Sequence, residues 1–138
     1  MANPLITNYD RSKTFVWNPR TEVGNYTNSG YDDVTLAKGT LMGRIASSNL
    51  LTPLTSGASD GSQFPVGVVL ADTVVASGDT AEITICVAGD VDENKLVFQG
   101  SDTLATVVSS KTLRDRIGAD TVGIKLVGGN QLTGFDNQ

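Results

Sequence analysis

From residue 34 onward, apolar positions recur along the chain with the spacing of β-strands. The clearest segment is residues 80–88, in which every second residue is apolar. These apolar positions are Ala81, Ile83, Ile85 and Val87. Such alternation is typical of a strand with one buried face. Further short apolar runs, bounded by Gly, Ser, Asp or Pro, predict strands at residues 34–36, 41–45, 50–54, 65–70, 73–76 and 122–127.

One region, residues 101–117, has helical spacing instead. Apolar residues recur there at i, i+3 and i+4, but in two groups that are out of phase. The first group is Leu104, Val107 and Val108, and the second is Leu113 and Ile117. We therefore predict one or two short helices with a break near Ser109 and Ser110, ended by Gly118. The fold class is then mainly β with a small helical part.

Residues 1–33 are polar and show neither period, although they hold five of the eight aromatic residues. We predict an extended N-terminal arm at 1–33, a β domain at 34–127 and a polar C-terminal tail at 128–138. Disordered tails are poor in aromatic residues. Two interpretations of the arm therefore stay open: it becomes ordered when it docks on a partner, or it folds back on its own domain.

Composition narrows the function classes. At 138 residues the chain has the length of one domain, and Thr, Val and Ile make up about a quarter of it. It contains no His, so no imidazole serves as a general base or zinc ligand. The net charge is −5 and the cations are scattered, which argues against nucleic-acid binding. No apolar stretch approaches the roughly 20 residues of a membrane span, and the first residues do not resemble a secretory signal.

Residues 57–61 match the G-x-S-x-G motif that surrounds the serine of many hydrolases. A catalytic serine needs an adjacent base, usually His, and a position between a strand and a helix. Ser59 has no His to pair with and lies in a Gly- and Ser-rich stretch before Pro65. We therefore interpret this motif as a loop, with a hydrolase that uses Ser59 as the weaker alternative.

Two further features suggest chemistry but fit a structural role better. Residues 90–94 begin like a calcium-binding loop, yet Lys95 and Ser101 occupy the positions where an EF-hand needs Gly and Glu. Cys86 is the single cysteine and lies within an apolar run, so we expect a buried hydrophobic residue rather than a reactive thiol. The sequence thus predicts no catalytic site, no metal site and no cofactor.

The segment Asp-Gly-Ser-Gln-Phe-Pro-Val-Gly-Val-Val-Leu at 60–70 resembles the lambda-type head decoration proteins of tailed phages. Gly-Thr-Leu-Met-Gly at 39–43, Ser-Gly-Asp at 77–79 and Gly-Ile-Lys-Leu at 123–126 follow the same pattern. The local chemistry agrees with this resemblance. Asp60 and Gly61 favour a turn, and the side chains of Ser62 and Gln63 can form hydrogen bonds to nearby backbone. Gly67 permits a bend or a close backbone approach within a strand.

The resemblance implies a β-clip-like fold and a structural function as a capsid cement protein. Such proteins bind the expanded phage head at threefold and quasi-threefold positions as trimers and stabilise it against the pressure of the packaged DNA. The implied partners are the major capsid protein and further copies of this chain, on the outer surface of a virion assembled in the host cytoplasm. The resemblance also favours docking of the arm. Its side-chain chemistry suggests these capsid contacts: Leu5, Ile6, Tyr9, Phe15 and Trp17.

An alternative of a different class is an adhesion module on the tail or head surface that binds host-cell glycans. Exposed aromatic rings can stack on sugars, and Trp17 and Tyr26 are the candidates in this sequence.

Overall fold

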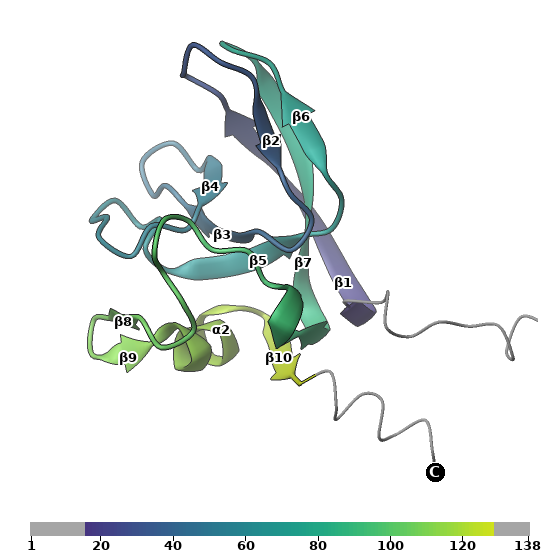
Figure 1. Ribbon diagram of the computed structural model, residues 1–138, viewed down its shortest axis with the longest axis vertical. Coiled ribbons are helices and arrows are strands. Elements are labelled where there is room, and N and C mark those ends of the chain that lie inside the picture. The colour runs from purple at the N-terminus through teal and green to yellow at the C-terminus, as the bar shows by residue number, and fades with distance from the viewer. Residues whose placement is uncertain (1–15, 129–138) are drawn as a thin grey trace, which may run out of the picture.

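The computed structural model describes residues 16–128, and its main feature is a six-stranded sheet (Figure 1). Its strands are β1 (Val16–Thr27), β3 (Leu41–Arg44), β4 (Leu51–Pro53), β5 (Pro65–Val69), β7 (Thr80–Asp92) and β10 (Gly123–Val127). The long strand β7 is central: β1 pairs with it antiparallel, β5 antiparallel and β10 parallel. The order continues from β5 to β3 and then β4. Because β1 pairs with β7 over almost its full length, β5 and β10 share the opposite edge of β7.

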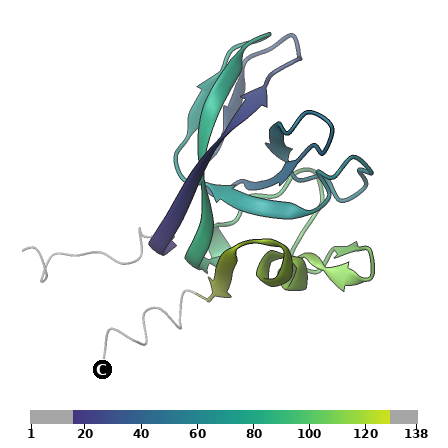
Figure 2. The same ribbon diagram turned by 180° about the vertical axis from the view of Figure 1, so that it is seen from behind.

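Two small sheets and one short helix complete the described residues. They are β2 (Val34–Leu36) paired with β6 (Thr73–Val75), β8 (Val107–Val108) paired with β9 (Lys111–Thr112), a 3₁₀ turn η2 (Glu93–Lys95) and the helix α2 (Leu113–Asp120). Figures 1 and 2 show β2 and β6 at one end of the molecule and α2, β8 and β9 at the other.

The main sheet has a buried cluster on each face. Adjacent residues of one strand point to opposite faces, so Val68 belongs to one cluster and Val69 to the other. On one face, α2 covers the sheet with Leu113 and Ile117, which are fully buried. On the other face, β2 and β6 contribute Leu36 and Val75, one residue from each strand. The continuous apolar run of β5 therefore supplies buried side chains to both faces of the sheet.

The mainly β fold class is confirmed. Each strand predicted from residue 34 onward is present to within a residue or two, except that β7 continues to Asp92 instead of ending at residue 88. The prediction for Cys86 is also confirmed, since its side chain is fully buried within the cluster that contains α2.

The predicted arm at 1–33 was wrong for residues 16–27, which form β1. Most of β1 is exposed to solvent because it lies at the edge of the sheet, and its side chains therefore show no apolar alternation. Of the two interpretations of the arm, folding back on its own domain holds for β1. Residues 1–15 lie outside the described part of the chain.

The predicted helix at 101–117 was also wrong in its first part. Residues 101–112 form turns and the β8–β9 hairpin, and the helix begins at Leu113. Thr112 caps this start by accepting a hydrogen bond from the Asp115 amide. The helix continues through Gly118 to Asp120. The break expected at Ser109 and Ser110 exists, but it is the tip of a hairpin rather than a gap between helices.

Candidate functional site

The loop at residues 60–63 is held by hydrogen bonds within the motif itself. Asp60 Oδ1 accepts from the Ser62 amide at 3.0 Å and from the Ser62 hydroxyl at 2.6 Å. Gln63 Oε1 accepts from the Gly61 amide at 2.9 Å. The hydrogen bonds from Ser62 lower the pKa of Asp60 below its ordinary value. This part of the motif therefore forms a closed turn between β4 and β5. Within it, Ser62 donates to the Asp60 side chain from both its hydroxyl and its amide.

Two glycines of the same motif allow backbones to pack closely. Gly61 has a φ of 104°, a conformation that favours glycine, and a Cβ there would lie 2.8 Å from the Arg44 carbonyl oxygen. Gly67, in β5, lies so near β7 that a Cβ would be 2.7 Å from the Cys86 carbonyl oxygen. The expected close approach at Gly67 is thus present. The residues of the motif shape the sheet and do not converge on a ligand cavity.

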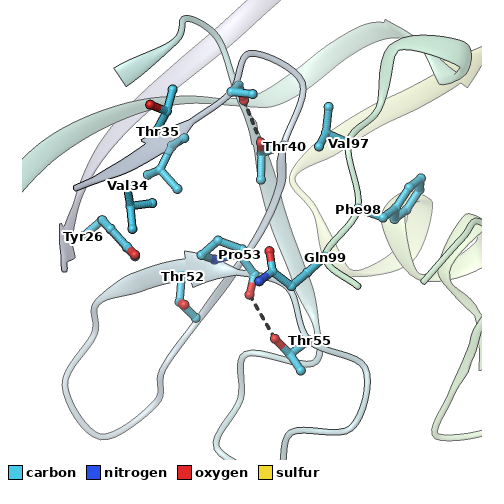
Figure 3. A pocket seen from close by; sticks show the side chains of 12 residues that line it. Tyr26, Val34, Thr35, Thr40, Thr52, Pro53, Thr55, Val97, Phe98 and Gln99 are labelled. Atoms are coloured by element: carbon cyan, nitrogen blue, oxygen red, sulfur yellow. Dashed lines mark hydrogen bonds between the residues drawn. The ribbon is translucent and has the colours of Figure 1, made fainter. Parts of the chain in front are cut away.

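A pocket of about 320 Å³ opens between β2, β4 and the segment after η2 (Figure 3). Figure 3 places Tyr26 and Val34 on one side and Val97 and Phe98 on the other, with Pro53 between them. The polar residues that line it are Thr35, Thr40, Thr52, Thr55 and Gln99. The hydroxyl groups of Thr40 and Thr55 already donate to backbone carbonyls. The pocket thus combines apolar walls with a few hydrogen-bonding groups, the usual composition of a recognition site.

A hydrogen-bonded loop at residues 28–33 connects β1 to β2. The Asn28 side chain is buried and donates from Nδ2 to the carbonyl oxygens of Asp32 at 2.8 Å and Val75 at 3.0 Å. Its Oδ1 accepts from the Gly30 amide at 3.0 Å. In contrast, the side chain of Tyr31, between these bonded residues, is 100% exposed. The loop therefore presents one aromatic side chain to solvent on a fixed backbone.

Of the residues suggested for a capsid-binding arm, only Trp17 lies in the described part of the chain. Leu5, Ile6, Tyr9 and Phe15 lie outside the described residues. Trp17 is part of β1, where it pairs with Asp90 and is only partly exposed. Its indole Nε1 is buried without a hydrogen-bond partner in the part of the chain that the structure describes. Tyr26, the other candidate for stacking on sugars, is also partly buried and packs against the core.

The motifs that suggested chemistry have structural explanations. Ser59 lies exposed in the loop before the Asp60 turn. Asp92 caps η2 by accepting a hydrogen bond from the Asn94 amide at 3.0 Å. Burial raises the pKa of the Cys86 thiol and so disfavours the reactive thiolate.

Within residues 16–128, no group of three or more acidic, Cys or His side chains is arranged to hold a metal ion. No helix in this range has the length and apolar character needed to cross a membrane.

Comparison with known families identifies the chain. A family model described as bacteriophage lambda head decoration protein D matches residues 26–112, more than half of the sequence. The chain belongs to this family. Its members are structural components of phage heads rather than enzymes, and the family associates the chain with the capsid of a virion. No curated protein matches the chain.

The head decoration match covers the β2–β9 part of the fold together with the Asp60 turn, the pocket and the Tyr31 loop. Most of β1 precedes it, while α2 and β10 follow it. Sequence reasoning found the Asp60 turn but missed the pocket, whose walls come from segments far apart in the chain. A signal for the Tyr31 loop was present: an aromatic residue stands among Asn, Ser, Gly and Asp, the residues that form turns.

Proposed function

We propose that this protein is a capsid cement protein, which binds the outer surface of the expanded phage head at threefold and quasi-threefold positions as a trimer. There it stabilises the shell against the pressure of the packaged DNA. The observation that carries the proposal is the family match, which extends over the central part of the folded domain. Each contact with the shell can be weak, because many copies bound to one lattice gain affinity through simultaneous attachment.

The N-terminal segment, residues 1–15, supplies the proposed contact with the major capsid protein. It contains the apolar side chains of Leu5, Ile6, Tyr9 and Phe15, and it leads directly into β1 beside Trp17. Burial of one such side chain contributes about 1.5–3 kcal/mol. Simultaneous attachment of many copies to one lattice adds to this stabilisation.

The first experiment measures binding of the purified protein to purified phage shells. We expect saturable co-sedimentation with expanded shells at three copies for each threefold position, and much weaker binding to unexpanded shells. Bound shells should also resist disruption at higher temperature than bare shells. Failure to bind expanded shells, or binding of only a few copies at the tail vertex, would overturn the proposal.

A second experiment tests the role of residues 1–15. Replacement of Leu5, Ile6, Tyr9 and Phe15 by Ser keeps the length of the segment but removes its apolar groups. We expect shell binding to weaken by roughly tenfold or more, since each tenfold corresponds to about 1.4 kcal/mol. The matched control replaces Val122, an exposed valine before β10, by Ser and should bind normally. Undiminished binding of the fourfold variant would exclude this segment as the capsid contact.

A further inference from the structure

Asp60 and Gly61 form the single Asp-Gly dipeptide of the sequence, which contains no Asn-Gly dipeptide. In such a pair the amide nitrogen of the glycine can attack the carboxyl carbon of the aspartate, because glycine has no side chain to hinder the approach. The new C–N bond closes a succinimide ring, the amide proton passes to solvent, and the carboxyl group loses its hydroxyl, so that one water is released. Water then opens the ring at either carbonyl and gives back aspartate or leaves isoaspartate.

Isoaspartate at position 60 would disrupt the loop between β4 and β5. The main chain would then run through the former side-chain carbon and be longer by one methylene group. The carboxylate that accepts both hydrogen bonds from Ser62 would become part of the main chain. Gly61 has little room to move, since a Cβ there would lie 2.8 Å from the Arg44 carbonyl oxygen and 3.2 Å from the Ala46 amide nitrogen. Rearrangement would therefore destabilise the packing of this loop on β3.

The folded turn holds the attacking nitrogen in a hydrogen bond. The Gly61 amide donates to Gln63 Oε1 at 2.9 Å, and the nitrogen must release this proton, and with it the bond, in order to attack. The neighbouring carbonyl groups are also bonded. The Asp60 carbonyl accepts from the Ala46 amide at 2.8 Å, and the Gly61 carbonyl accepts from the Phe64 amide at 3.2 Å. These bonds limit rotation of the peptide unit toward the carboxyl group.

The carboxyl group of Asp60 is held in its less reactive form. A hydroxyl group leaves readily from the protonated acid but not from the carboxylate. Ser62 stabilises the carboxylate by donating from its amide at 3.0 Å and from its hydroxyl at 2.6 Å, and these bonds lower the pKa of Asp60. Ser62 is only 3% exposed, so solvent competes little for its hydroxyl. The turn thus restrains both reacting groups, the nitrogen through Gln63 and the carboxyl group through Ser62.

We propose that the Asp60–Gly61 peptide is a latent site of isoaspartate formation, and that Gln63 and Ser62 protect it as long as the chain is folded. The protection belongs to the single folded chain and needs neither a shell nor a second copy. It gives the Asp-Gly-Ser-Gln segment a role beyond its turn, because the serine and glutamine side chains shield the dipeptide that forms the turn. In the proposed cement function, an assembled virion has no protein synthesis that could replace damaged copies.

Rates of isoaspartate formation in the full-length chain test this protection. Purified protein is incubated at neutral pH, and isoaspartate at position 60 is measured by peptide mapping and by labelling with an isoaspartyl methyltransferase. We expect the folded wild type to react at least about tenfold more slowly than the same chain unfolded in guanidinium chloride, a factor equivalent to about 1.4 kcal/mol in the barrier. Equal rates in the folded and unfolded chains would overturn the proposal.

Substitutions of Gln63 test the bond to the glycine amide. Gln63→Met removes the acceptor but keeps an unbranched side chain, and it should raise the rate roughly three- to tenfold, the effect of one lost hydrogen bond. Gln63→Glu keeps an acceptor oxygen and should react at nearly the wild-type rate. Gln99→Met makes the same change as Gln63→Met at an exposed position outside the turn and should leave the rate unchanged. A wild-type rate in Gln63→Met would show that this bond does not protect the site.

A variant that is destabilised elsewhere distinguishes loss of this bond from general opening of the fold. Ile117→Val removes a methyl group from a fully buried side chain of α2 and leaves the turn intact. Where circular dichroism shows both variants folded, only Gln63→Met should accumulate isoaspartate faster than the wild type. Equal acceleration in both would overturn the proposal, because opening of the whole fold would then control the reaction. No step of the measurement involves shells, so its result and the cement function succeed or fail separately.

Discussion

At the scale of single residues, Asp60 stabilises a turn on which two strands depend. Its carboxylate accepts two hydrogen bonds from Ser62, whose own carbonyl oxygen accepts from the Thr55 amide at 3.3 Å. The same carbonyl lies so close to Gly43 in β3 that a Cβ there would clash with it. A single ionised group thus organises the loop that joins β4 to β5, and the loop in turn packs on β3.

The Asp60 turn predicts a pH dependence of stability. The pKa of Asp60 is lowered in the folded state from its ordinary value of 3.8. Its contribution to the free energy of unfolding is therefore complete above pH 3.8 and is lost as the pH falls through the lowered folded pKa. In Asp60→Asn the side chain does not ionise, so stability should decline less steeply with acid below about pH 4.

Urea unfolding of the wild type and of Asp60→Asn at several pH values between 2 and 6 measures this difference. Asp79→Asn is the control, because it removes an acidic group outside this turn. Identical pH profiles for the wild type and Asp60→Asn would show that the carboxylate does not stabilise the turn.

At the scale of elements, the β8–β9 hairpin shows which parts of the fold can be predicted from the sequence and which cannot. The apolar residues Leu104, Val107 and Val108 fit a helical period, but three residues cannot distinguish that period from a turn followed by a strand. The deciding contacts are tertiary. The Leu113 amide donates to the Thr106 carbonyl at 2.8 Å, and Arg116 donates to the carbonyl of Val108 at 3.0 Å. Strands such as β7 were predictable because their alternation is long and their burial differs between faces.

The tip of this hairpin is strained, which gives a prediction. Ser109 and Ser110 have φ angles of 49° and 74°, values that favour Gly or Asn in two-residue hairpin turns. In Ser110→Gly the steric cost of the left-handed conformation is removed, while glycine adds entropy to the unfolded chain. We therefore expect the free energy of unfolding to rise by roughly 0.5–1 kcal/mol.

Thermal and urea unfolding of Ser110→Gly measure the gain. Ser59→Gly is the matched control, since Ser59 is exposed and does not have a positive φ. It should be neutral or slightly destabilising, because glycine increases the entropy of the unfolded chain. An equal gain in both variants would contradict the explanation by turn strain.

At the scale of the whole molecule, β1 contacts β4, although the sequence pattern placed β1 in an arm and β4 in a separate domain. Gly24 of β1 lies against Leu51 of β4, so that a Cβ on Gly24 would be 2.6 Å from the Leu51 Cδ1 atom. The two ends of the strand order β1-β7-β5-β3-β4 therefore approach each other, and the sheet curls around one of its clusters. Local sequence could not show this, because the pairing of β1 joins residues about 60 positions apart, as between Gly24 and Ile83.

The position of β1 predicts different results for two truncations. Without residues 2–15 the described fold is complete, and the variant should unfold at nearly the temperature of the full-length chain. Without residues 2–27 the edge of β7 loses its partner and the Leu51 side chain loses its cover at Gly24. Because a domain is stable by only about 5–15 kcal/mol, loss of a twelve-residue strand should remove most of that margin.

Circular dichroism and thermal unfolding of both truncated chains show whether β1 is part of the folding unit or an edge strand added to a domain that is stable without it. The family match begins at residue 26, near the end of β1. If the shorter chain unfolds cooperatively at the temperature of the full-length protein, the matched region is stable alone and β1 is an added edge strand. If only the chain that keeps β1 is folded, as we expect, then β1 is part of the folding unit. Residues 1–15 are then the segment that can be removed from the N-terminus to test capsid binding without loss of the fold.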